Sequence, residues 1–279
     1  MKWRGRQGSG NIEDRRGMGR GKMVGGGIGS IVIVIIIWLL GGDPSQLMDS
    51  SQPDVQTEQV TTTPEEDEMA QFVAVVLKDT EIVWSKIFEQ SGSSYRQPVL
   101  VLFRDEVQSA CGNASAASGP FYCPGDEKIY IDLSFCDQLR SRFGASGDFA
   151  IAYVIAHEIG HHVQNLTGIL SKVDNQRSGL NQTRANQLTV RLELQADFLS
   201  GMWAHYAQSM LNSLDAGDIE EAINAASAVG DDAIQKMTTG KVVPDAFTHG
   251  TSAQRKEWFR KGLETGDFKQ GDTFTANIR

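Results

Sequence analysis

The chain has 279 residues, of which 40% are hydrophobic and 22% are charged, and its net charge is −9. These fractions are typical of a globular protein that can bury a sizeable core, with room for accessory segments. The charge is uneven, because residues 1–22 hold seven Lys or Arg against two acidic residues, which leaves −14 for residues 23–279. An acidic body argues against nucleic acid as a partner.

Residues 23–42 read MVGGGIGSIVIVIIIWLLGG, a stretch of 20 residues without a charge. That length is enough for a helix to cross a bilayer, so the segment predicts one transmembrane helix and a membrane partner. A cleaved signal peptide is less favoured, because the basic segment before it is long and no clear small-x-small cleavage site follows.

The flanking charges predict an orientation for this span. Seven Lys or Arg precede it, and none follows until Lys78. By the positive-inside rule, residues 1–22 are expected to form a basic cytoplasmic arm. The protein would then be single-pass, with its catalytic domain in the periplasm or outside the cell.

A folded domain is expected over residues 64–279. Residues 43–63 are polar, contain Pro, Ser and Thr, and lack periodic apolar residues, which indicates a flexible stalk. The domain begins at a capping box, Thr63-Pro64-Glu65-Glu66, which predicts a helix to about Glu89.

The remaining pattern predicts an α+β fold that is mostly helical and carries a small sheet. Residues 98–103 and 128–133 have the composition of strands, and the alternation in the second predicts a half-exposed edge on which an extended substrate could pair. A polar loop is expected over 171–182. Helices are expected over 134–143, 148–166, 183–211, 218–229 and 252–264.

The three cysteines leave the pairing open. Cys111 and Cys123 bracket a loop rich in Gly, Ala and Ser, which a disulfide could close in an oxidising compartment. Cys136 would then be left over. The alternative is three buried free thiols, and we favour the Cys111–Cys123 pair.

The stretch AHEIGHHVQ, residues 156–164, holds three of the five histidines in the chain. His157 and His161 are four residues apart on an expected helix, so their imidazoles project from one face and can bind adjacent vertices of a tetrahedral zinc ion. Glu158 follows His157 and lies beside the metal, within reach of a bound water. His162 is on a different face, and we interpret it as structural or exposed and not as a ligand. We interpret His205 as structural.

A catalytic zinc site needs a third protein ligand, and the segment ELQAD, residues 193–197, offers one. Glu193 and Asp197 are four residues apart on one face of the long expected helix. Glu193 would complete a His2Glu set for one zinc ion per chain. Asp197 could accept the other N–H of a ligand histidine and so orient its ring.

The segment AFTHGTSAQR leads into the last expected helix and carries two further candidates. His249 lies in a loop, where it is suited to donate a hydrogen bond to an oxyanion. Arg255 could brace Glu193 or Asp197 through a bidentate pair. The alternative is a surface histidine with an arginine on a helix surface.

Several separated segments together resemble one family. CGNASAASGPFYCPGDEKIYIDLSF, HEIGHHVQN, RLELQADFLSGMWA and FTHGTSAQRKEWF, with the basic arm and the span, are similar to the neutral zinc metallopeptidases of bacterial membrane-anchored proteins. The resemblance covers nearly the whole chain except the stalk. It implies a zincin-type fold and a zinc-dependent peptidase.

The order of these motifs is also similar to that of the membrane heat-shock and prenyl-protein proteases. In those families the first glutamate of ExxxD is the third metal ligand, and a loop His and Arg assist the transition state. Carried over, these residues would be Glu193, His249 and Arg255, with Asp197 completing the motif. This chain departs from the pattern at Gly250, where those families tend to have proline.

The expected function is hydrolysis of peptide bonds in envelope or extracytoplasmic proteins. Zinc would activate a water, Glu158 would act as general base, and His249 would stabilise the oxyanion. The alternative is a non-hydrolytic zincin-like binding or scaffold protein, which Glu158 disfavours because a scaffold needs no base. A purely structural zinc site is also disfavoured, because such sites usually have four protein ligands.

Overall fold

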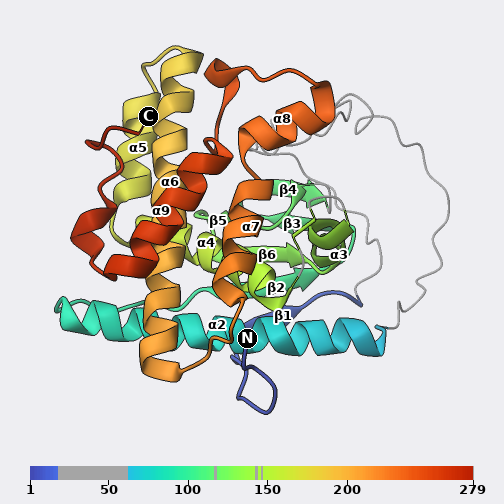
Figure 1. Ribbon diagram of the computed structural model, residues 1–279. Helices are drawn as coiled ribbons and strands as arrows, with labels where there is room; N and C mark the ends of the chain where they lie inside the picture. The colour runs from blue at the N-terminus through green and yellow to red at the C-terminus, as the bar shows by residue number, and fades with distance from the viewer. Residues whose placement is uncertain (18–61, 116–117, 142–143, 146, 279) are drawn as a thin grey trace.

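A computed structural model describes residues 1–17, 62–115, 118–141, 144–145 and 147–278. The described chain is mostly helical and has one small mixed sheet with a separate hairpin, which confirms the predicted α+β class. Figure 1 shows the helices α4, α6 and α9 grouped beside the sheet, with the long helix α2 running beneath both. The bounds of each element follow below.

Helix α2 spans Pro64–Gln90 and begins as the sequence predicts. The Thr63 hydroxyl accepts from the backbone N–H of Glu66, and the Glu66 carboxylate accepts from the backbone N–H of Thr63. This reciprocal cap satisfies two donors that a helix start leaves free. The helix buries Phe72 and Trp84, and side chains of this size stabilise the core by about 1.5–3 kcal/mol each.

The main sheet has the strand order β1-β2-β6-β5. Its strands are β1 (Ile12–Asp14), β2 (Val99–Phe103), β5 (Phe121–Cys123) and β6 (Lys128–Asp132). The first three in this order run parallel, and β5 pairs antiparallel with β6. The prediction that residues 128–133 form an edge is therefore wrong, because β6 lies inside the sheet and β5 forms that edge.

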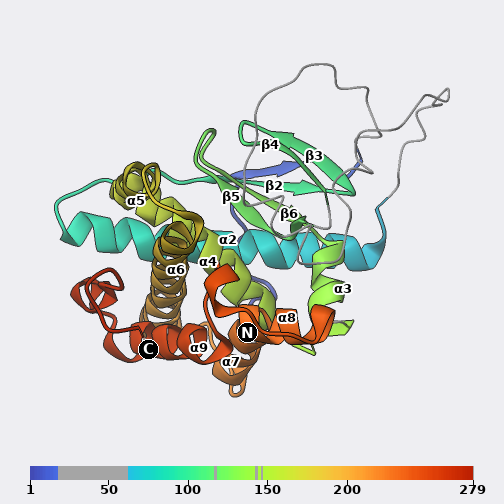
Figure 2. The same ribbon diagram turned by 90° about the horizontal axis from the view of Figure 1, so that it is seen from above.

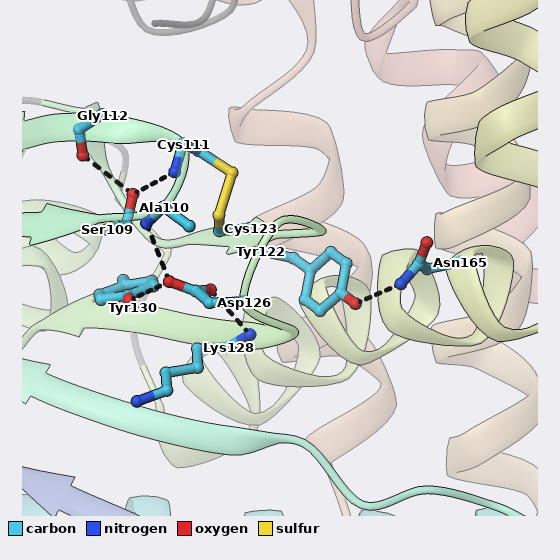
Figure 3. Close-up of a disulfide and its surroundings, with 10 residues drawn as sticks. All are labelled: Ser109, Ala110, Cys111, Gly112, Tyr122, Cys123, Asp126, Lys128, Tyr130 and Asn165. Atoms are coloured by element: carbon cyan, nitrogen blue, oxygen red, sulfur yellow. Dashed lines mark hydrogen bonds between the residues drawn. A yellow bond between two sulfur atoms is a disulfide. The ribbon is translucent and has the colours of Figure 1, made fainter. Parts of the chain in front are cut away.

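A hairpin covers the sheet face that is turned away from the helices. It consists of β3 (Glu106–Ser109) and β4 (Gly112–Ser115), and its Val107 and Ala114 pack on Val101, Phe103 and Tyr130. Figure 2 shows the sheet between this hairpin and the helices α2 and α4. A disulfide between Cys111, in the hairpin turn, and Cys123, in β5, ties the hairpin to the edge strand (Figure 3). Cys136 is buried and unpaired with another cysteine.

Three helices form the centre of the helical layer. They are α4 (Asp148–Leu166), α6 (Gln182–Leu211) and α9 (Ser252–Thr265). Glycines allow their backbones to approach: a Cβ on Gly160 would lie 3.0 Å from the Ala196 carbonyl, and one on Gly201 would lie 2.0 Å from that of Phe259. Any larger residue at Gly201 would force α6 and α9 apart.

Smaller elements complete the layer. α3 (Ser134–Ser141) and α7 (Asp218–Ala228) lie where the sequence predicts helices. α5 (Ile169–Arg177) replaces the predicted polar loop, and α8 (Asp231–Thr239) was not predicted. Both are short, and each buries few side chains, so their sequences carry little apolar periodicity. Two 3₁₀ turns follow, η3 (Pro244–Ala246) and η4 (Phe268–Gly271).

The N-terminal segment is part of this domain and not a separate basic arm. Trp3 is buried and packs edge-on against Phe72, with 5.4 Å between ring centroids. Ser9 donates its backbone N–H to Ala74, and β1 pairs with β2. Residues 1–17 therefore share one sheet and one core with residues 62–278.

This arrangement corrects the predicted localisation. A chain that crossed a membrane once at residues 23–42 would place residues 1–17 and 62–278 on opposite sides, whereas here they pack together. The predicted span itself, like nearly all of the predicted stalk, lies outside the described residues. Within the described ranges, no helix has the length and apolar content needed to cross a membrane. The prediction of a single-pass protein with a cytoplasmic N-terminus is therefore wrong.

Candidate metal centre

Helices α4 and α6 bring three side chains to one point. His157 and His161 lie one turn apart on α4, and Glu193 faces them from α6. One ligand atom from each of the three lies within 4.8 Å of the others. The Glu193 carboxylate is 3.1 Å from His157 Nε2 and 3.5 Å from His161 Nε2. Two imidazoles and a carboxylate in this arrangement are a donor set that zinc prefers, so the residues fit such an ion.

His157 is oriented by a buried network of charges. Its Nδ1 lies 2.9 Å from Asp197 Oδ1, which leaves Nε2 to face Glu193. Asp197 also accepts from Arg255 at 2.8 and 3.0 Å and from the Tyr153 hydroxyl at 2.5 Å. Asp197 thus orients a ligand-set histidine, Arg255 braces Asp197 rather than Glu193, and Tyr153 is a member that the sequence analysis missed.

His161 is oriented by an amide on its own helix. Its Nδ1 lies 2.9 Å from Gln164 Oε1, and Gln164 Nε2 donates to the Leu192 carbonyl at 2.8 Å and to Gln195 Oε1 at 3.1 Å. Because an amide oxygen can only accept, His161 Nδ1 must carry a proton, and Nε2 faces the Glu193 carboxylate 3.5 Å away. Gln164 was not predicted, although its place three residues after His161 on one helix is a signal that could have identified it.

The carboxylates of α6 and the histidines of α4 shift one another's pKa values across the centre. Burial raises the pKa of Asp197, but Arg255 and His157 lower it to about 2. Burial lowers the pKa of His157, yet Asp197 and Glu193 raise it to about 10. The pKa of Glu193 lies well below its usual range because His161 and His249 outweigh burial. The lowered pKa values of Glu193 and Asp197 keep both carboxylates negative, a charge that a divalent ion on the histidines would balance.

Glu158 lies in the same helical turn and is 8% exposed. Burial raises its pKa, although the nearby His161 and His157 lower it in part. The backbone N–H of Tyr122, in β5, also lowers this pKa in part. Glu158 is thus a carboxylate of raised pKa that lies near His157, His161 and the edge strand β5.

The third histidine of the motif fixes the edge strand on α4. His162 Nδ1 lies 3.0 Å from the Tyr122 hydroxyl, which also accepts from Asn165 at 2.9 Å (Figure 3). Its Nε2 lies 2.6 Å from the Arg96 carbonyl. Burial lowers the pKa of His162. It is structural, as the sequence predicts, and its bonds place β5 beside the centre.

The loop before α9 carries His249 close to this centre. The charge of His249 helps to lower the pKa of Glu193, although its ring atoms are not among the three that cluster within 4.8 Å. Gly250 has φ +93°, which a proline could not adopt, so a local backbone conformation accounts for glycine at this position. His205 instead bonds the Leu263 carbonyl at 2.8 Å and holds α6 to α9.

The fold and the site together define a helical domain with an HExxH helix and a carboxylate from a second helix. The model of the family described as "Putative neutral zinc metallopeptidase" matches residues 1–274, and the chain belongs to that family.

Three relatives share most of its length. It is 45% identical to the uncharacterized protein YpfJ of Escherichia coli K12, over 100% of both chains. It is 39% identical to the uncharacterized proteins Mb2605 of Mycobacterium bovis and Rv2575 of Mycobacterium tuberculosis H37Rv, over 85% of each chain. No solved structure matches the chain.

Proposed function

We propose that the chain is a zinc-dependent peptidase in which His157, His161 and Glu193 hold one ion. The observation that carries this proposal is the convergence of two Nε2 atoms and one carboxylate, with each imidazole held at Nδ1 by a separate partner. When bound, zinc would supply Lewis-acid polarisation of a water and of a substrate carbonyl. The zincin-type fold implied by the resemblance remains a prediction.

Glu158 is the proposed general base. It neighbours the ligand histidines, and its raised pKa lies closer to neutrality, where proton transfer is most effective. Its carboxylate would take a proton from the attacking water and pass it to the leaving amine. A binding protein would have no use for a buried carboxylate of raised pKa at this position.

The edge strand β5 is the proposed site for an extended substrate. Within the described chain, β5 pairs on one side only, with β6, and the backbone of its Tyr122 reaches Glu158. A peptide added to the free side would therefore lie along the base and the metal centre. Main-chain pairing of this kind binds many sequences, since it recognises the backbone.

His249 and Arg255 are proposed to act in different ways. His249, whose charge interacts with Glu193, would stabilise the oxyanion that develops on the substrate carbonyl. Arg255 is buried in the Asp197 network and would act through His157. We therefore treat Arg255 as a positioning residue.

The test is cleavage of casein and of a mixed peptide library by the purified chain, with and without a chelator. Zinc added after chelation should restore cleavage. Glu158→Gln should retain zinc and lose about 10²–10⁴-fold in kcat. Glu264→Gln, an exposed change on α9, is the matched control and should behave as wild type. Zinc binding without cleavage in the wild type would favour the binding or scaffold alternative, and full activity in Glu158→Gln would refute the assigned base.

A further inference from the structure

The loop that carries His249 is held by one buried carboxylate. Asp231, the first residue of α8, is 1% exposed. Its Oδ2 accepts from three successive backbone N–H groups, those of Thr248, His249 and Gly250, at 2.7, 2.6 and 3.0 Å. The Asp231 N–H returns a bond to the Gly250 carbonyl at 2.9 Å. This two-way pairing fixes the loop backbone on the start of α8.

The second oxygen of the same carboxylate reaches the imidazole. Asp231 Oδ1 lies 3.2 Å from His249 Nδ1, and the Thr248 hydroxyl lies 3.1 Å from the same nitrogen. An ionised carboxylate only accepts hydrogen bonds, so Nδ1 must carry a proton. Within the described chain, no hydrogen bond engages Nε2, which is therefore the nitrogen left for a ligand.

We propose that Asp231 is a positioning residue that holds His249 with its proton on Nδ1 and its Nε2 free to act on substrate. The inference deepens the proposed peptidase function and rests on it for the role of His249. A second proton, on Nε2, makes the ring a cation whose charge Asp231 balances. A charged donor of this kind binds a developing oxyanion more strongly than a neutral imidazole does.

The substitution Asp231→Asn makes a specific prediction, because an amide has only one acceptor oxygen. Three backbone N–H groups donate to the position of Oδ2, so the oxygen of the new amide is expected to take that position. The amide NH2 must then face His249 Nδ1, which has to accept. The proton of the neutral ring would move from Nδ1 to Nε2. A carboxylate with a purely structural role would leave this proton where it is.

The neighbouring Asp232 provides a matched control on the same turn of α8. Its Oδ1 accepts from the Ser252 N–H at 2.7 Å and from the Ser252 hydroxyl at 2.9 Å, at the start of α9, and within the described chain it has no hydrogen bond to His249. Asp232→Asn removes the same charge from the same helix turn. It should leave the His249 tautomer unchanged and kcat within about twofold of wild type.

The test is ¹⁵N NMR of the histidine rings in the full chain, without metal or substrate, across the pH range in which it stays folded. In the wild type, Nδ1 of the neutral His249 ring should be protonated; in Asp231→Asn, Nε2 should be. An unprotonated Nδ1 in the wild type would overturn the proposal, and this outcome does not depend on whether the variant folds. An unchanged tautomer in a folded Asp231→Asn would overturn it as well.

Kinetics of the zinc-loaded chain give the functional half of the test. Asp231→Asn should lower kcat by about 10–100-fold and leave KM within about threefold. In a His249→Ala background the same change should add almost nothing. If Asp231→Asn slows the enzyme no more than Asp232→Asn, the positioning role fails. If the wild type cleaves no peptide but Nδ1 is protonated, the peptidase proposal fails and the tautomer assignment stands.

Discussion

The metal centre and the N-terminal segment both bury charges, and they differ in how those charges are satisfied. At the N-terminus, Arg6 donates to both oxygens of the buried Asp79, and Ser9 and Asn11 donate to the buried Glu81. Each of these charges has a partner within the protein. At the centre, the Nε2 atoms of His157 and His161 and the carboxylate of Glu193 face one another. Each of the two rings is hydrogen-bonded through its Nδ1 to a different residue.

The difference distinguishes a structural charge cluster from a ligand site. A carboxylate paired by a bidentate arginine holds two segments together and offers nothing to a ligand. Two imidazoles that are held at Nδ1, so that both Nε2 atoms face one carboxylate, are arranged as a ligand set for a cation. Burial and charge are similar in both regions, so neither one alone identifies a functional site.

The largest expected effect on stability comes from the N-terminal segment. Arg6→Ala would leave Asp79, which is 1% exposed, without the partner that offsets its burial. Loss of one partner of such a pair costs about 3–5 kcal/mol, which urea unfolding would measure. Arg4→Ala is the control, because Arg4 and Glu68 are both exposed and such pairs contribute about 0–1 kcal/mol.

The comparison also predicts what Arg6→Ala leaves intact. Zinc affinity and kcat per folded molecule should match wild type, because no hydrogen bond of Arg6 within the described residues reaches α4 or α6. A small stability loss, equal to that of Arg4→Ala, would show that Asp79 does not need its partner. A selective loss of activity would show that the two regions are coupled.

A smaller effect is expected at the second partner of the metal centre. Gln164→Ala removes the acceptor that holds His161 Nδ1 and leaves the ligand itself in place. Outer partners of this kind contribute about 10–100-fold to metal affinity, which competition with a chromophoric chelator would measure. Gln208→Ala, an exposed change near the end of α6, should leave affinity unchanged. Equal affinity in all three proteins would contradict the role given to Gln164.

The smallest expected effect is a loss of stability of strand β1 at low pH. Lys128 and Arg15 lower the pKa of Glu13, and Arg16 lowers that of Asp14. A lowered folded-state pKa gives stability that is present above the unfolded value, about 4, and is lost as pH falls through the folded value. Both side chains are over a third exposed, so each contributes less than about 1 kcal/mol after screening.

Hydrogen exchange would measure this effect in β1. Its amides should exchange faster, relative to those of β6, as pH falls below about 4 and these carboxylates are protonated. The Glu13→Gln variant should show less of this change, because it lacks one of the titrating groups. Equal protection of the two strands at low pH would contradict the account.

Much of the fold and site followed from local chemistry. The capping box at Thr63 and the four-residue spacings of His157 with His161 and of Glu193 with Asp197 depend on short-range geometry, which a sequence displays directly. The edge position of β5, the pairing of β1 with β2 and the bond from Asp231 to His249 join residues far apart in the chain. Such pairings depend on tertiary packing, so no local sequence pattern predicts them.

The basic N-terminal segment is a case in which local sequence patterns led to a wrong prediction. Its arginines and the apolar stretch at 23–42 fit a membrane-anchor pattern, and charge counting cannot tell a cytoplasmic arm from a strand. Arg6 and Arg16 instead pair with acids of α2. The buried Asp79 and Glu81 were the missing signal, because acids on the buried face of a helix need partners from elsewhere.

The central claim is that His157, His161 and Glu193 together hold one zinc ion, and its most direct test is zinc K-edge X-ray absorption on the purified chain. The account predicts one zinc per chain, coordinated by two imidazoles and by oxygen at about 2.0–2.2 Å. In Glu193→Ala the oxygen shell should change and the affinity should fall. Substoichiometric zinc in the wild type, sulfur at about 2.3 Å, or an unchanged spectrum in Glu193→Ala would contradict it.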